Sequence, residues 1–213
     1  MGKVYYVPLW CAEVSNHYNV KALPMQTHQH FLKQAGEVVL TATNAEEDRL
    51  LTKYGIKGIL LLSLLSSLSF PFSFPLNFMH LIFENLIPNL ISHYTGTFKD
   101  LDCGSEDYEL PADVWSAICK AGAALGKTIP SSFRPWVPNI RREQSRMTAD
   151  AWSFWSQYIG PVLLCNCFQS HHHYKHFMDL IHLIKLCLNY DMEPTDIKEI
   201  WHGFVKWVME YEE

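Results

Sequence analysis

The side chains with the clearest chemical potential lie where an extended segment passes into a helix, in the sequence SFPFSFPLNFMHLIFENL. Pro71 and Pro75 hold the backbone extended, because proline fixes φ and keeps the preceding residue out of the α region. Apolar residues then recur at helical spacing after Asn77. His80 lies one helical turn beyond Asn77, and Glu84 follows one turn later. The pattern places Asn77 at the start of a helix, where asparagine is a favourable N-cap.

A second group of candidate ligands combines two cysteines with a histidine tract. Its members lie within a dozen residues: Cys165, Cys167, His171, His172, His173 and His176. These side chains suit Zn²⁺ if the chain reverses and brings them together. The C-x-C spacing is not that of a standard structural zinc site, and the alternative is a polar helix start with the cysteines as small core residues. We therefore predict no metal site in the chain.

A basic segment interleaved with an aromatic residue is the candidate contact for nucleic acid. Its arginines surround Trp136: Arg134, Arg141, Arg142 and Arg146. Guanidinium groups beside an aromatic ring are typical of surfaces that contact phosphates. A solvated loop is the alternative. Because the formal net charge is −5, we expect weak DNA binding or none.

The segment around Asn77 resembles the CACTA-type (En/Spm-like) DNA transposases of mushroom-forming fungi. Their pattern F-P-x-D-x-M-H-L, followed by E-N-L, is matched here by Phe74, Pro75, Met79, His80, Leu81, Glu84, Asn85 and Leu86. Asn77 stands at the Asp position. Further segments look like family segments in the same order: YYVPLW, YGIKGILLLS, YTGTFKDLD, TIPSSF, AWSFWSQYIGPVLL and YKHF. The resemblance covers nearly the whole chain.

The resemblance implies a fragment of an RNase H-like core interrupted by a large helical insertion. The fold class would be mainly α with a minor β part, with residues 1–92 as the partial core and residues 93–213 as the insertion. Asn77 would be a degenerate metal-ligand position among the catalytic positions, which include His80 and Glu84. The other acidic residues of the family are expected outside the segments that match here.

The Asn for Asp replacement has a direct physical meaning. Two-metal phosphoryl transfer holds two cations with anionic oxygens, and Mg²⁺ selects carboxylates and water over amides. An asparagine offers one neutral carbonyl oxygen. We therefore expect the Mg²⁺ of the family to be lost, no cofactor to be bound, and the chain to be a catalytically inactive fragment of a cut-and-paste DNA transposon.

A non-enzymatic interaction module is the alternative function, in which the helical insertion dimerises or binds a partner protein. The apolar helices favour self-association, since a core severed at both ends leaves apolar faces uncovered. An intracellular location is expected because the six cysteines show no secreted framework, and the resemblance implies the nucleus.

The elements that position these residues are mostly helices with readable ends. We predict a helix from a capping-box-like Asn44 to Gly55, a second opened by Pro111, a third capped by Thr148 and stopped at Gly160 and Pro161, and two more over 174–190 and 194–211. Strand patterns occur only in the first dozen residues and over 63–77. The uncharged run between Lys57 and Glu84 is broken by prolines, so we expect a buried strand or core segment and no membrane span.

Overall fold

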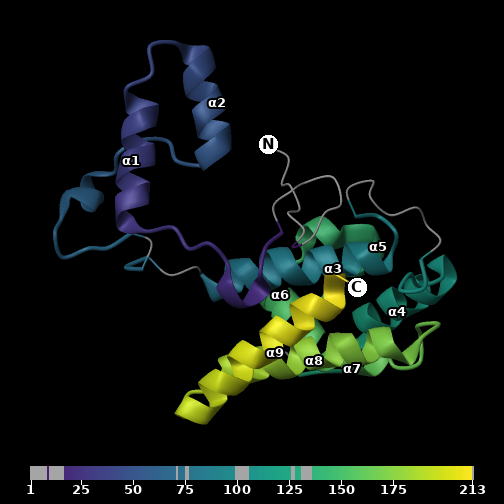
Figure 1. Cartoon of the computed structure of the whole chain (residues 1–213). Helices are drawn as coiled ribbons and strands as arrows, with labels where there is room; N and C mark the ends of the chain where they lie inside the picture. The colour runs from purple at the N-terminus through teal and green to yellow at the C-terminus, as the bar shows by residue number, and fades with distance from the viewer. Residues whose placement is uncertain are drawn as a thin grey trace. The chain divides into compact units, whose positions relative to one another are not determined.

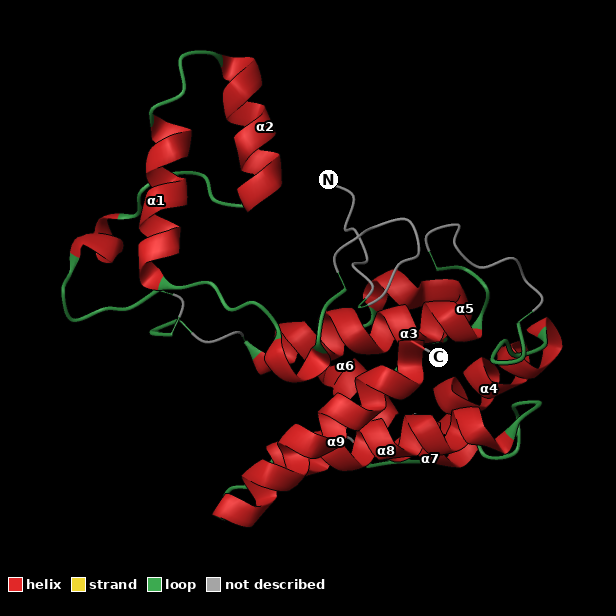
Figure 2. Cartoon of the chain, in the orientation of Figure 1, coloured by secondary structure: helices red, strands yellow, loops and turns green. Residues whose placement is uncertain are grey.

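The computed structural model describes residues 9, 17–70, 72–74, 77–98, 106–125, 128–130 and 136–212. In these residues the regular structure is helical and no strand is present (Figure 2). The prediction of a mainly α chain is therefore confirmed. The strand expected over 63–77 is wrong for the described residues of that range, and the strand expected in the first dozen residues lies outside the description, apart from Leu9.

The chain divides into two compact units. The larger unit comprises Met1–Lys21 and Asn77–Glu213, and the smaller unit comprises Ala22–Leu76 (Figure 1). The predicted boundary at residue 92 stays a prediction. It separates a core from an insertion on the basis of the family resemblance, whereas the two units here are defined by their compactness.

The smaller unit is built around a helical hairpin of α1 (His28–Val39) and α2 (Asn44–Tyr54). Thr27 caps α1 by accepting a hydrogen bond from the His30 backbone N–H, and Thr43 caps α2 in the same way from Glu46. The predicted cap, Asn44, is thus the first helical residue. Gly55 ends α2 with φ 67°, the left-handed conformation that glycine adopts without strain.

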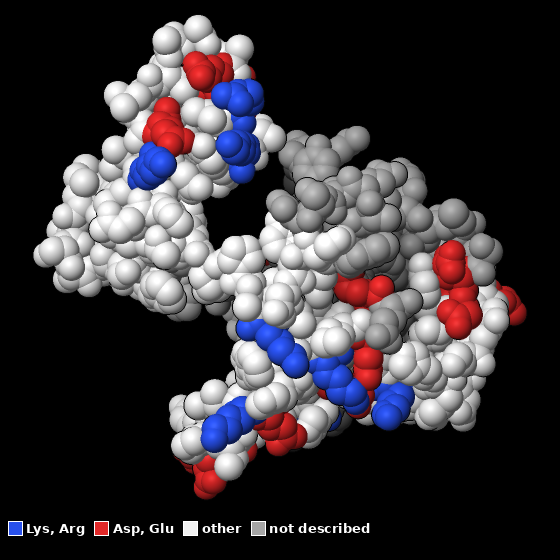
Figure 3. All heavy atoms as spheres, viewed as in Figure 1, with Lys and Arg blue, Asp and Glu red and all other residues white. Residues whose placement is uncertain are grey.

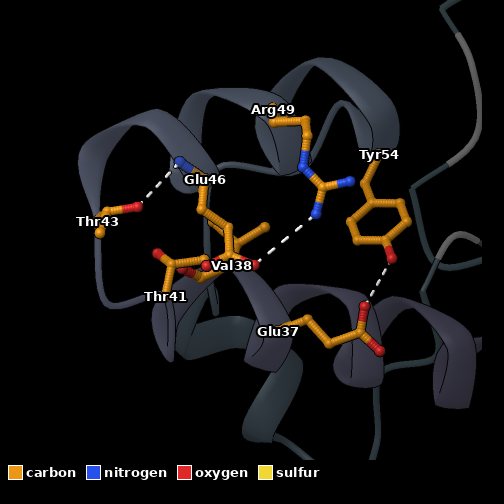
Figure 4. Close-up of polar contacts among 7 residues, drawn as sticks. All are labelled: Glu37, Val38, Thr41, Thr43, Glu46, Arg49 and Tyr54. Atoms are coloured by element: carbon orange, nitrogen blue, oxygen red, sulfur yellow. Dashed lines mark hydrogen bonds and ion pairs between the residues drawn. The ribbon is translucent and has the colours of Figure 1, made fainter.

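A side-chain hydrogen bond joins the two helices of this hairpin (Figure 4). The Tyr54 hydroxyl donates to the Glu37 carboxylate at 2.6 Å, and this hydrogen bond raises the pKa of Tyr54. Within α2, Arg49 and Glu46 form a longer ion pair at 3.8 Å. Beneath them lies a small apolar cluster in which the rings of Phe31 and Phe70 stack with centroids 4.7 Å apart.

The apolar run that follows the hairpin is not buried. A short 3₁₀ turn, η2 (Leu61–Leu64), carries leucines that face solvent, and Leu61 is 84% exposed. Only Ser63 is buried in this turn, and its hydroxyl donates to the Leu60 carbonyl. The prediction of a buried strand or core segment is therefore wrong for this turn, and the described residues contain no strand that could pair with it. No helix of the described residues is long and apolar enough to cross a membrane.

Two helices of the larger unit contain π-helical segments. The segment η3 (Met79–Leu86) precedes α3 (Ile87–Tyr94), and η6 (Trp155–Ile159) lies between α6 (Ala149–Phe154) and α7 (Gly160–Leu163). In each segment a backbone N–H donates to the carbonyl five residues earlier, as in a π-helix: Ile87 donates to Ile82, and Gly160 donates to Trp155.

A proline follows each π-helical segment at the second position of the next α-helical segment. These are Pro88 and Pro161. In a continuous α-helix, each proline would lack a hydrogen bond and clash with the carbonyl four residues earlier. The π geometry changes that spacing, so the predicted stop at Gly160 and Pro161 is wrong and the helix continues to Leu163.

The remaining helices enclose an aromatic core. They are α4 (Ala112–Leu125), α5 (Ile140–Glu143), the 3₁₀ turn η5 (Gln144–Arg146), α8 (His171–Cys187) and α9 (Pro194–Glu212). Thr148 caps α6 as predicted, and α9 begins at Pro194 as predicted. Trp155 is fully buried and meets Trp115 and Trp152 edge to face.

Helices α8 and α9 pack along each other and cross closely at Gly203. A Cβ atom added at Gly203 would collide with the buried side chain of Leu183. Nearby, the Trp207 indole N–H donates to the His176 carbonyl, and the His176 ring donates from Nε2 to the Trp207 carbonyl, each at 2.9 Å. These reciprocal bonds are buried and fix the register of the two helices.

Candidate functional site

Asn77 caps a helix by the geometry of its side chain. Its Oδ1 accepts hydrogen bonds from the backbone N–H groups of Met79 at 2.9 Å and His80 at 3.3 Å. These are N–H groups that have no partner within the helix itself. The capping role considered from the sequence is therefore present in the structure, whatever the ancestry of the position.

His80 and Glu84 lie on the exposed surface of η3. The His80 Nε2 is 3.4 Å from a carboxylate oxygen of Glu84, and both side chains are solvent-accessible. Asn85 donates from its amide to the His80 carbonyl at 2.6 Å. No group of three His, Cys, Asp or Glu side chains in the described part of the chain is arranged to hold a metal ion.

The arginines around Trp136 make contacts within the protein. Arg141 donates to the Ala112 carbonyl at 2.8 Å, while Arg146 pairs with Glu143 at 2.9 Å and lies over the Trp136 ring at 4.4 Å. The Arg142 side chain is exposed, and Arg134 lies outside the described residues. On the described part of the face drawn in Figure 3, basic and acidic side chains are interspersed. Two of the four arginines thus bond within the protein, and phosphate contact by this segment stays a prediction.

The cysteines and histidines of the 165–176 segment have separate surroundings. The Cys167 thiol donates to the Leu163 carbonyl at 3.1 Å, and burial raises its pKa. Ser170 caps α8, which begins three residues earlier than predicted, so the histidine tract forms the first turns of a helix. The interpretation as a polar helix start describes this segment, although His176 is buried.

The histidines instead take part in a cavity that the sequence did not predict. The cavity measures about 420 Å³ and lies between the C-terminal ends of α3 and α9, the start of α8 and the segment around Asp107. Such a volume falls in the range of small-molecule sites. Every residue of its lining belongs to the larger unit. We call it the histidine cavity.

Stacked rings form one wall of the histidine cavity. The His176 ring lies parallel to the Trp207 indole with centroids 4.5 Å apart, and Trp207 stacks on Tyr211 at 5.3 Å. The His93 ring meets Tyr211 edge to face with centroids 5.7 Å apart and stacks on Phe98 at 4.0 Å. These rings are held by both helices and by the core, so the wall is preformed.

Titratable groups give the histidine cavity its electrostatic character. The His173 Nε2 is 3.0 Å from an Asp107 carboxylate oxygen. Burial lowers the pKa of His176, which favours its neutral form, although nearby Glu210 opposes the shift. Burial strongly raises the pKa of Tyr94, so its phenol stays protonated. A histidine tract was the only sequence signal for this place, because its partners lie far away in the chain.

No protein-family model, curated protein or solved structure matches this chain. The resemblance to CACTA-type transposases therefore rests on the motifs around Asn77 and on the order of the accompanying segments.

Proposed function

We propose that the chain is a fragment derived from a CACTA-type DNA transposase and does not cut DNA by itself. The observation that best supports the absence of cleavage is the use of the Asn77 carboxamide oxygen as a helix cap, while the transposase origin rests on the resemblance. That oxygen is neutral and is already engaged by two backbone N–H groups. A ligand for a cation pair would need anionic oxygens facing the metals.

The exposed setting of the neighbouring candidates fits the same proposal. The His80 and Glu84 side chains lie on the surface and face each other. Metal-assisted phosphoryl transfer works best in a shaped site that excludes bulk water. An RNase H-like ancestry and a nuclear location belong to this proposal and rest on the resemblance.

The test is a DNA cleavage and strand-transfer assay with the purified chain in Mg²⁺ or Mn²⁺. We expect no product from the wild type or from Asn77→Asp. Aspartate caps helices as well as asparagine does, so the variant keeps its fold and its inactivity cannot be assigned to unfolding. Metal-dependent cleavage that disappears in His80→Ala or Glu84→Ala would refute the proposal.

A helical interaction module is the second candidate, and the exposed face of α9 favours it. Ile197 and Trp201 are 58% and 49% exposed, one helical turn apart. Phe204 and Val208, expected on the same face, pack partly against the core of the larger unit. An exposed tryptophan beside an isoleucine is typical of residues that contribute strongly to protein interfaces.

Self-association measured by sedimentation velocity at low and near-physiological salt tests this second candidate. We expect association that persists at higher salt, because apolar contacts are not screened, and that weakens in Trp201→Ala. The matched control is Trp136→Ala, which removes another half-exposed tryptophan. A monomer at every concentration, or equal weakening by both variants, would count against an interface on α9.

A further inference from the structure

Cys165 and Cys167 lie two positions apart in the short turn that joins α7 to α8. The Cys167 backbone N–H closes this turn by donating to the Leu164 carbonyl at 3.1 Å. Between the cysteines, Asn166 has φ 58°, a left-handed conformation that asparagine tolerates. Leu164 and Phe168 are buried, so the turn is anchored on both sides and holds the two cysteines together.

Both sulfur atoms lie at the end of α7. The Cys167 thiol donates to the Leu163 carbonyl at 3.1 Å, and its Sγ is 3.6 Å from the Cys165 carbonyl oxygen. Burial and the neighbouring Cys165 thiol raise the pKa of Tyr174, whose hydroxyl donates to the Pro161 carbonyl at 2.7 Å. The Cys165 side chain therefore lies on the same side of the turn as that of Cys167.

The chain between the two cysteines is short enough for a disulfide. Residues two positions apart have Cα atoms at most about 7 Å apart when extended and closer in a turn, which is the span that a disulfide bridges. Since the Cys167 sulfur already contacts the Cys165 carbonyl group, rotation about the Cα–Cβ bond of exposed Cys165 brings its own sulfur into reach.

The cysteines of the described part of the chain differ in exposure. Cys165 is exposed, Cys167 and Cys187 are half-buried, and Cys119 is buried. Burial raises the pKa of Cys119 to about 11 and also raises the pKa of Cys167 and of Cys187. Because a thiol reacts as the thiolate and must be reached from solution, Cys165 is the described cysteine best placed to meet a small reagent first.

We propose that Cys165 and Cys167 form a site for thiol–disulfide exchange with a small disulfide of the glutathione type. The Cys165 thiolate attacks one sulfur of glutathione disulfide, and a glutathione thiolate leaves, which gives a mixed disulfide on Cys165. The Cys167 thiolate then attacks the Cys165 sulfur and expels the second glutathione thiolate. The two protein thiols lose two electrons and two protons in total, and glutathione disulfide becomes two glutathione thiols.

The resulting disulfide should be a reversible modification. Its ring closes across a single residue, and departure from relaxed disulfide geometry makes the bond easier to reduce. Oxidation also removes the Cys167 S–H that donates to the Leu163 carbonyl. A bond of this kind is typical of regulatory or labile disulfides and not of structural crosslinks.

Mass spectrometry of the full chain after incubation with glutathione disulfide tests the proposal. Once free thiols have been alkylated, trypsin releases the peptide 147–175, which contains Cys165, Cys167 and no other cysteine. We expect this peptide without alkyl groups and lighter by two hydrogen atoms, and we expect excess reduced glutathione to reverse the change. A peptide that stays fully reduced, or that keeps glutathione without forming an internal disulfide, would overturn the proposal.

Three serine variants assign the two roles. Cys167→Ser should accumulate at least about tenfold more mixed disulfide on Cys165 than the wild type, because the intramolecular displacement of glutathione is lost. Cys165→Ser should leave the peptide reduced. Cys187→Ser is the matched control, since it removes another half-buried cysteine outside the turn and should behave as the wild type.

Circular dichroism verifies that the variants are folded, and serine at position 167 keeps a donor for the Leu163 carbonyl. If folded Cys167→Ser and the wild type carry equal amounts of mixed disulfide, Cys167 does not displace glutathione and the proposal fails. If Cys165→Ser reacts as fast as the wild type, Cys165 is not the first thiol to react, and the proposed order of steps is wrong.

Discussion

The two units of the chain stabilise their helices in different ways. In the smaller unit, a hairpin with surface polar contacts covers a cluster of Phe31, Ala35, Ile56 and Phe70. In the larger unit, tryptophans and aliphatic residues from many helices form one continuous core. Since buried apolar area supplies most folding free energy, the two units should differ in resistance to opening.

Tryptophan fluorescence separates the two units experimentally. None of the seven tryptophans lies between residues 22 and 76, so this signal follows the larger unit alone. Far-UV circular dichroism follows the helices of both. Both signals are recorded during one denaturant titration. A difference between the two unfolding curves then measures the difference in stability between the two units.

The largest expected effect comes from Trp155→Ala in the core of the larger unit. Trp155 is fully buried, and truncation of a buried tryptophan costs about 3–5 kcal/mol of unfolding free energy. Urea denaturation followed by fluorescence measures the loss. Trp136→Ala is the control, because a half-exposed residue should cost less than about 1 kcal/mol. Equal losses from both variants would contradict the picture of a tightly packed core.

A smaller loss is expected where α8 and α9 cross. Gly203→Val places a branched side chain against buried Leu183, and overpacking of this kind costs about 1–3 kcal/mol. The same urea titration measures it. Unchanged stability would mean that the two helices separate easily, which would make the larger unit more adaptable than its reciprocal His176–Trp207 hydrogen bonds indicate.

The pH dependence of stability should report on His176. Burial holds its pKa below the ordinary value, so on acidification the unfolded chain binds a proton before the folded chain does. Stability should therefore fall as pH drops below about 6.5, and no penalty exists above that value. His176→Gln keeps a donor for the Trp207 carbonyl and should lose less stability over the same range. Parallel pH profiles of wild type and variant would exclude this role of His176.

The smallest expected effect is a gain in the smaller unit. Gly36 lies within α1, and a Cβ atom there would meet no atom within 4 Å. Gly36→Ala should therefore stabilise the hairpin by about 0.5–1 kcal/mol through helix propensity. Far-UV circular dichroism in urea measures the gain. Destabilisation by Gly36→Ala would show that α1 is packed more tightly than the cluster around Phe31 indicates.

The sequence predicted those features that depend on neighbours in the chain. Thr148 caps α6 and Gly55 ends α2 because a cap needs only a side chain and the adjacent backbone. The exposure of Leu61 could not be predicted, since it depends on whether distant segments cover this side chain. The histidine cavity escaped prediction for the same reason: His176 and Trp207 are 31 residues apart.

The position of Asn77 illustrates a limit of a different kind. Its sequence context is compatible with both a helix cap and a former metal ligand, and the structure resolves the geometry of the cap. A cap is a local property, whereas a metal site needs carboxylates from elsewhere. The ancestry of this position therefore stays a prediction for the cleavage assay.

The two π-helical segments have a consequence for the comparison of this chain with remote relatives. Each segment contains one residue more than an α-helical turn would need, and each is followed by a proline at 88 or 161. A relative that lacks the proline can close the same helix with one residue fewer. An alignment that confines gaps to loops would then shift by one position all helix residues that lie between the loop gap and the missing residue. A one-residue gap inside the helix, directly before the proline, is where length differences between such relatives should be sought.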